Sequence, residues 1–344
     1  MDMSIFQCLW FCLIFVLIAG YFVLDGFDLG AGVLYPLIAK TEGEKAVVRR
    51  SVGPVWDGNE VWLLTAGGAL FAAFPMAYAT TFSGFYLAIM LVLFGLIVRA
   101  ISLEFRAHDP KWGKAWDACF IIGSLLPALL FGVAVGNIYA GIPMDANGDY
   151  SGIPLLGLVT PFTLLTGLLG LAMFLAAGAA WVALKAEMGS KLRARAAKLR
   201  MPLGVAVLVL FAVVSVYGHF IIQPAMDPSL NILRWLFAIL FVVAVAASMA
   251  LGRKESGDKP AFLAQCAAAI MLVGLLAASM FPNLVVASAD SVGASITLMN
   301  GSATDLSLMW MTGITCVGLP LVLIYHVVIY RTFRGRISEK DLAH

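Results

Sequence analysis

Four carboxylates stand within otherwise apolar sequence, in two short segments. Two acids lie three residues apart in segment 24–30 (LDGFDLG), and two more have the same spacing in segment 56–62 (WDGNEVW). On a helix, residues three apart share one face. Ionisable side chains in membrane-spanning sequence are costly and usually face the protein interior, where they transfer protons or ions. The spacing therefore indicates a proton relay with four candidate members: Asp25, Asp28, Asp57 and Glu60.

A structural role for the same acids is the alternative. Asp57 and Glu60 fall in the first turns of a predicted helix, where carboxylates offset the positive end of the helix dipole. Asp28 and Asp57 could instead hydrogen-bond to backbone groups, or pair with Arg99 or Arg106. The sequence alone permits both a proton relay and a structural role for these four acids.

Composition decides the environment of these acids. Of the 344 residues, 62% are hydrophobic and only 12% are charged, whereas soluble proteins carry roughly 25% charged residues. We therefore expect an all-α integral membrane protein, with a single transmembrane domain over 1–344. A helical span needs about 20 apolar residues. Nine spans are predicted: 5–30, 55–75, 78–100, 116–138, 158–184, 202–222, 232–251, 261–281 and 307–330.

The basic residues predict how these spans are oriented. Of the 22 Lys and Arg residues, 21 fall in alternate connections or at their edges, and Arg234 is the exception. Basic connections favour the cytoplasm, so the N-terminus is expected outside and the C-terminus in the cytoplasm. The four acids then lie near the inner side of the membrane. The basic run 191–200 is expected to contact anionic lipid head groups, and no nucleic-acid partner is expected.

Metal or haem ligation by this chain is not indicated. The five cysteines are scattered through apolar segments without a CxxC pair, which argues against a metal site or a disulfide framework. The four histidines are His108, His219, His326 and His344, and no predicted span carries a pair of them. Because haem sites in spans usually need paired axial ligands, we predict no haem held by these side chains.

Two more features lie close to the acids. Arg99 and Glu104, with Trp116 and Asp117, predict a polar rim on the inner side that locks helices, binds lipid head groups or holds a quinone head group. Trp62 follows Asp57 by about one and a half turns, which places it deeper than the interfacial aromatic belt. It either packs a helix interface or lines a path for a small gas.

With these residues in hand, the chain closely resembles subunit II of the cytochrome bd quinol oxidases. Besides 24–30 and 56–62, the matching segments are 63–75 (LLTAGGALFAAFP), 82–86 (FSGFY), 122–127 (IGSLLP), 132–137 (GVAVGN), 280–282 (MFP) and 335–337 (GRI). The resemblance is densest over residues 21–137. Its compact connection between the sixth and seventh spans is similar to the cyanide-insensitive branch.

The resemblance implies an assembly with a larger subunit I, which holds two b-type haems and one d-type haem, oxidises quinol and reduces O2 to water. Subunit II then supplies neither a haem ligand nor a catalytic residue. The acids matching Asp25 and Asp57 lie on a proton route, and the Trp matching Trp62 lies at the narrow part of an oxygen channel. Some members hold a structural quinone near the positions of Asp28, Arg99 and Asp117.

The resemblance also implies a place in the bacterial inner membrane, with membrane lipids and, in some members, small single-span accessory subunits as partners. Some relatives carry Gln where Glu60 stands, so Glu60 is not expected to be essential. A stand-alone proton-coupled transporter is the alternative that the residues alone permit. Such transporters usually bind at the midplane between inverted repeats, whereas these acids gather on one side and the DGFD motif is not repeated.

Overall fold

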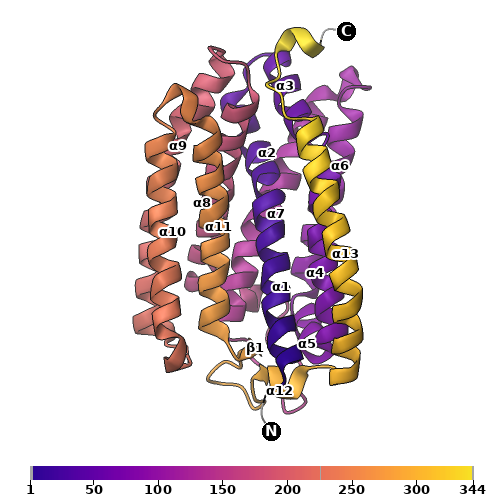
Figure 1. Ribbon diagram of the computed structural model, residues 1–344, viewed down its shortest axis with the longest axis vertical. Coiled ribbons are helices and arrows are strands. Elements are labelled where there is room, and N and C mark those ends of the chain that lie inside the picture. The colour runs from indigo at the N-terminus through magenta and orange to yellow at the C-terminus, as the bar shows by residue number, and fades with distance from the viewer. Residues whose placement is uncertain (1–2, 225, 343–344) are drawn as a thin grey trace.

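Long helices lie side by side along one axis in the computed structural model, which describes residues 3–224 and 226–342 (Figure 1). The chain begins at one end of this bundle and finishes at the other, and these ends are called the N-terminal end and the C-terminal end below. The α-helices are α1 (Ile5–Leu24), α2 (Gly26–Ile38), α3 (Glu42–Val52), α4 (Trp56–Ala73), α5 (Pro75–Gly84), α6 (Tyr86–Phe105), α7 (Gly113–Ala140), α8 (Pro161–Lys185), α9 (Lys191–Tyr217), α10 (Asn231–Leu251), α11 (Asp258–Met280), α12 (Leu298–Gly301) and α13 (Asp305–Thr332).

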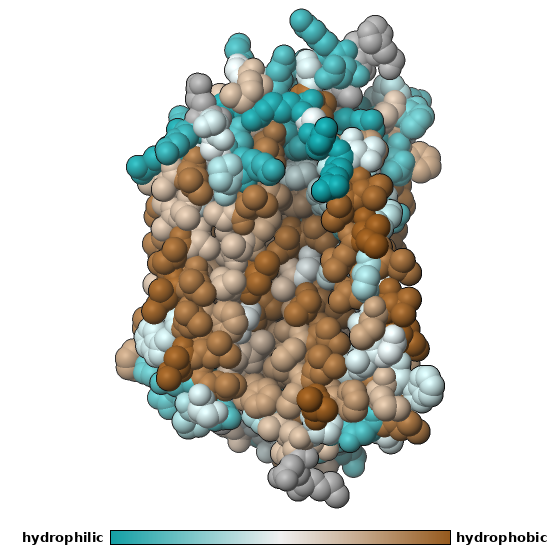
Figure 2. Space-filling view, in the orientation of Figure 1, coloured by the Kyte–Doolittle hydropathy of each residue, from teal (hydrophilic) through white to brown (hydrophobic). Residues whose placement is uncertain are grey.

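Eight helical segments of the described chain are long and apolar enough to cross a membrane. Apolar side chains cover the middle of the visible face, and polar ones gather at both ends, most densely at the C-terminal end (Figure 2). The predicted span 55–75 corresponds to α4, which is not among the eight because polar side chains occupy its first turns. The all-helical membrane class is therefore confirmed, while the count of nine spans stays a prediction.

Several predicted boundaries differ from the structure. The first span continues through α2 to Ile38, rather than ending at 30, with a one-residue interruption at Asp25. The third is divided at Phe85 into α5 and α6, and α6 runs on to Phe105. The helix therefore extends beyond the predicted limit of 100, and Arg99 is paired inside the protein.

Helix α9 begins at Lys191 and not at 202, because Ser190 accepts a hydrogen bond from the backbone N–H of Arg193 and so caps a longer helix. The basic run 191–200 thus lies on a helix with Leu192 and Ala196 buried against the protein. An apolar-length rule misses such an amphipathic extension.

Helix α8 is the most enclosed of the eight segments. It meets α2 closely at Gly30 and Gly178, where a Cβ on either glycine would clash with the backbone of the other helix. Glycine at both positions therefore permits the close approach of the two helices. This contact fixes α2 against α8 and so holds the Asp25–Asp28 turn in the middle of the bundle.

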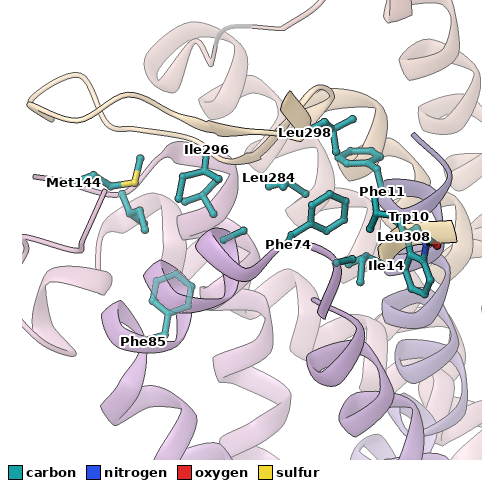
Figure 3. Close-up of a cluster of buried hydrophobic side chains, with 14 of the residues drawn as sticks. Trp10, Phe11, Ile14, Phe74, Phe85, Met144, Leu284, Ile296, Leu298 and Leu308 are labelled. Carbon is teal, nitrogen blue, oxygen red and sulfur yellow. Dashed lines mark hydrogen bonds between the residues drawn. The ribbon is translucent and has the colours of Figure 1, made fainter. Parts of the chain in front are cut away.

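Segment 282–306 forms an ordered cap at the N-terminal end. Strands β1 (Asn283–Val285) and β2 (Ile296–Thr297) pair antiparallel, and α12 follows directly. Leu284, Ile296 and Leu298 pack there against side chains of α1 and the α4–α5 corner, including Phe11 and Phe74 (Figure 3). The N-terminal ends of α1 and α13 are joined by a hydrogen bond from the Trp10 indole to the Leu308 carbonyl.

Candidate functional site: a buried cluster of acids around Arg99

Arg99 of α6 is fully buried less than two turns before its helix ends. Its Nη2 atom lies 2.7 Å from Asp25 Oδ1 and 2.6 Å from Glu60 Oε1. The three side chains come from the α1–α2 junction, α4 and α6, so the ion pairs join three helices. A guanidinium removed from water needs such partners, because an unpaired buried charge costs several kcal/mol.

Asp28 belongs to the same cluster but is held by a neutral partner. Asn59 donates from Nδ2 to Asp28 Oδ2 at 2.7 Å and to the Leu24 carbonyl at 3.0 Å. The amide oxygen of Asn59 accepts from the Tyr330 hydroxyl of α13 at 3.0 Å. Both ends of the amide are therefore engaged, which fixes its orientation and that of the Asp28 carboxyl group.

The charge balance of this cluster is unequal. Asp25, Asp28 and Glu60 share a single cation, Arg99. Five buried polar atoms in the region have no partner within the described chain: Tyr21 Oη, Asp25 Oδ2, Asp28 Oδ1, Arg99 Nε and Arg99 Nη1. Buried polar atoms normally hydrogen-bond to protein or to ordered water. A site with more acids than cations can hold a proton on one carboxyl group and pass it to another.

Asp57 lies outside the buried cluster. Its side chain is exposed in the first turn of α4, makes no capping hydrogen bond, and has no ion-pair partner among the residues described. Glu60, one turn further along α4, has a side chain that is 22% exposed. Glu60 thus stands between the exposed Asp57 and the buried Arg99. The structure brings three of the four predicted acids together and leaves Asp57 at the surface beside them.

The predicted alternative pairing of Asp28 or Asp57 with Arg99 or Arg106 is not found. Arg106 instead bonds to Asp117 and Glu42.

Trp62 is buried on α4 and packs against Gly20 of α1. Its indole N–H donates to Nε2 of His326 at 3.1 Å, and the other ring nitrogen of His326 lies 2.9 Å from the Val322 carbonyl. This arrangement requires a neutral imidazole with its proton on Nδ1. The sequence gives no sign of this contact between Trp62 and His326, because 264 residues separate the two.

Asp117 belongs to a different cluster, at the C-terminal end. Its carboxylate accepts from Tyr35 at 2.9 Å and pairs with Lys45 at 2.8 Å and Arg106 at 2.9 Å. The hydrogen bond from the Lys45 ammonium to Asp117 raises the pKa of Lys45. The expected single rim of Arg99 and Asp117 is therefore two separate clusters.

Asp258, at the start of α11, was missed by sequence reasoning. It is buried and bonds to three arginines at 2.8–2.9 Å: Arg193, Arg200 and Arg336. These arginines come from α9 and the segment after α13, and no local spacing joins them to Asp258.

A cavity of about 640 Å³ lies between α1, α7, α8, α9, α10 and α11. Its lining is mainly apolar, and towards the N-terminal end it includes Tyr139, His219 and Arg234. Arg234 donates to the carbonyl of Asp227 at 2.9 Å. None of Asp28, Arg99 and Asp117 lines this cavity.

The described histidines do not fit paired haem ligation. Both ring nitrogens of His326 are engaged, and His108 lies in the short exposed connection after α6 with Nδ1 against the Glu104 carbonyl. His219 lines the large cavity as a single imidazole, and His344 lies outside the described residues. Within the described ranges no group of three His, Cys, Asp or Glu could hold a metal ion.

Comparison with known proteins identifies the class to which this chain belongs. The family model described as cytochrome bd terminal oxidase subunit II matches residues 6–333. Cytochrome bd-I ubiquinol oxidase subunit 2 of Escherichia coli is 32% identical, over 99% of this chain and 97% of that protein. Cytochrome bd ubiquinol oxidase subunit 2 of Bacillus subtilis is 33% identical, over 97% of each chain. A probable cytochrome oxidase subunit 2 of Haemophilus influenzae is also 33% identical, over 98% of this chain and 96% of that one.

The fold agrees with this class. The structure of the bd oxidase from Geobacillus thermodenitrificans superimposes with a TM-score of 0.72 at 15% identity, covering 96% of this chain and 99% of that one.

The chain belongs to the cytochrome bd terminal oxidase subunit II family. It is therefore a multi-pass membrane subunit of a quinol:oxygen oxidoreductase complex of the respiratory chain, whose cofactors include haem. Nothing in these comparisons favours a stand-alone transporter.

Proposed function

We propose that this chain is the haem-free subunit of its oxidase and carries protons from the C-terminal end of the bundle towards a haem-bearing subunit I. The single observation that carries the proposal is the acid excess around Arg99, next to an exposed acid on an apolar face. Subunit I would hold the two b-type haems and the d-type haem. These supply the electrons that reduce O2, while the side chains of this chain hold and transfer protons.

The proton would enter at Asp57 and reach Glu60, one helical turn away. Glu60 and Asp25 contact the same guanidinium, so a proton arriving at Glu60 can reach Asp25 without crossing an apolar gap. Asp28, whose carboxyl group is oriented by Asn59, is a further buried acid that can exchange a proton with this route. Ordered water bonded to the unpartnered oxygens of Asp25 and Asp28 would complete the relay.

The face formed by α4 and α13 is proposed to dock on subunit I. Helix α13 lies along one edge of the bundle (Figure 1), and little of it is buried within this chain. Four glycines on these helices have no neighbour that a Cβ would clash with, namely Gly67, Gly68, Gly313 and Gly318. Small residues let membrane helices approach closely. An exposed acid such as Asp57 is costly against lipid, which favours a protein partner on this face.

Trp62 is proposed to lie beside the oxygen path, between this docking face and the acid cluster. Its ring is held by Gly20 on one side and by His326 through the indole N–H. A rigid indole defines the width of a neighbouring apolar passage better than a mobile one.

A structural quinone is proposed for the large apolar cavity. Its volume falls within the range of about 300–1,000 Å³ typical of small-molecule sites. Tyr139, His219 and Arg234 offer donors to a head group, and the apolar lining suits an isoprenoid tail. Asp28, Arg99 and Asp117, which the family resemblance suggested, are engaged with other side chains.

We also propose that the chain has nine spans including α4 and a cytoplasmic C-terminal end, and that it lies in the bacterial inner membrane. Membrane lipids and small single-span accessory subunits are its proposed further partners. The concentration of Lys and Arg in alternate connections supports this orientation.

Asp57→Asn in the purified complex tests the proposal. The amide keeps the shape and much of the hydrogen bonding but cannot transfer a proton at neutral pH. Haem content should be unchanged while steady-state O2 consumption falls. Full turnover with normal haem would remove Asp57 from the route, and loss of haem would assign it a structural role.

A further inference from the structure

A second cavity, of about 230 Å³, lies at the C-terminal end, and none of Asp25, Asp28, Glu60 and Arg99 lines it. Its walls come from α3, the connection between α3 and α4, α8, α13 and the segment that follows α13. Three cations line it, Arg50, Lys185 and Arg336, with one carboxylate, Asp341. Cations from three distant segments have thus been gathered around one small space, although like charges repel.

Lys185 is the most informative of the three. It is only 7% exposed, and its ammonium donates to the Phe333 carbonyl and lies 5.2 Å from the centroid of the Trp181 ring. No carboxylate of the described residues lies within ion-pairing distance of it. A buried ammonium without a negative partner is strongly unfavourable. The described side chains therefore leave the Lys185 ammonium without a negative partner.

The other two cations differ in how many protein partners hold their side chains. Arg336 is fixed, because it donates to the carbonyls of Ala183 and Ala186 and pairs with Asp258. Arg50 is exposed, lies over the Phe333 ring at 5.9 Å and has no ion pair in the described part of the chain. Asp341 accepts from the backbone N–H of Ser338 at 2.9 Å and pairs with neither Arg50 nor Lys185.

We propose that this cavity binds a phosphate group, with Lys185 and Arg50 as its principal ligands. Arg336, whose position is fixed by its other partners, adds positive charge to the lining. A phosphate offers several acceptor oxygens and matches the donors of arginine and lysine. The volume is below that of a typical drug-sized site, which suits a phosphate or a lipid head group. Two sources share this chemistry: the head group of an anionic phospholipid and free inorganic phosphate.

The test uses the purified two-subunit complex in phosphate-free buffer, and native mass spectrometry reports bound species. One arm adds phosphatidylglycerol in nanodiscs, and the other adds inorganic phosphate. Lys185→Met removes the buried ligand, and Arg50→Gln removes the exposed one, where folding is not at risk. Arg253→Gln is the matched control, an exposed arginine at the same end that does not line the cavity.

Each ligand variant should weaken binding about tenfold, because a hydrogen bond to a charged group is lost, and Arg253→Gln should bind as the wild type does. Retention of phosphatidylglycerol alone identifies a lipid site, and binding in both arms identifies a general phosphate site. Binding in neither arm, or equal binding by Arg50→Gln and Arg253→Gln, overturns the proposal.

Asp341→Asn separates the proposal from internal neutralisation by Asp341. Removing that carboxylate should leave phosphate binding equal or tighter, because it removes a repulsive charge from the cavity. If Asp341 itself were the countercharge, the variant would lose thermal stability and would show no phosphate-dependent recovery. That result would also contradict the proposal.

Discussion

The clusters around Arg99 and around Asp258 have opposite charge balance. In the first, one guanidinium pairs with Asp25 and Glu60 and lies beside a third acid, Asp28, which Asn59 holds. In the second, one carboxylate pairs with three guanidiniums. Arginine does not lose its proton in proteins, but a carboxyl group can gain one. An excess of arginines is therefore a fixed charge pattern that holds helices together. An excess of acids can change its protonation, and this is the property that a proton route requires.

The largest effect is expected from Asp258→Asn. The substitution leaves three guanidiniums around a site that is no longer charged, and breaking a buried ion pair from one side costs about 3–5 kcal/mol. The complex should lose its haem on purification, as measured by the absorption spectrum and the yield. Asp290→Asn, an exposed acid at the N-terminal end, is the control and should purify normally. A full haem spectrum in Asp258→Asn would show that this cluster is not needed for assembly.

Arg99→Gln is expected to affect assembly less and turnover more. The acids left behind can take up protons and become neutral, which the arginines around Asp258 cannot do. Haem content should remain well above that of Asp258→Asn, while O2 consumption falls about tenfold, because the cation that stabilises the ionised carboxyl groups is lost. If both variants lost haem equally, the contrast between the two clusters would not hold.

A smaller effect is expected where His326 holds Trp62. His326→Leu removes the acceptor of the indole N–H, a loss of about 1 kcal/mol. The hydrogen-bond-sensitive indole band in ultraviolet resonance Raman spectra should shift, and the apparent KM for O2 should change more than kcat. His326→Gln, whose amide oxygen can accept, should restore both readouts. An unchanged KM with a shifted band would leave His326 a packing role only.

The smallest effect concerns Glu44, which caps α3 and pairs with Arg195. Burial raises the pKa of Glu44, but the backbone N–H groups of Lys40 and Thr41 and the Arg195 guanidinium outweigh burial and leave it below its usual range. A carboxyl group with a depressed pKa stabilises the fold above its unfolded pKa of about 4.3, and this stability is lost as pH falls through the folded value. Thermal unfolding from pH 6 to pH 3 should show this loss, and Glu44→Gln should make it shallower. Equal slopes would contradict the assignment.

The sequence predicted the helices and the gathering of the acids, because apolar length and alternating basic connections are properties of the chain itself. It could not predict the partner of Arg99, since Asp25 lies 74 residues away on another helix. For the same reason Arg99 was assigned to a rim with Asp117, and the Asp258 cluster was missed. A charged residue near the end of an apolar run gives the same sequence signal whether it faces lipid head groups or a buried acid. Only packing distinguishes these two cases.

The most direct test of the proton route is the rate of proton uptake in Asp25→Asn. Asp25 is fully buried, is bonded to Arg99, and has no exposed surface through which it could act on another partner. Uptake can be followed with a pH-indicator dye as the reduced purified complex reacts with O2, and the haem spectrum serves as the control for assembly. We predict normal haem content and normal electron delivery, with proton uptake slowed in step with O2 consumption. Proton uptake at the wild-type rate in a fully assembled Asp25→Asn complex would contradict the account.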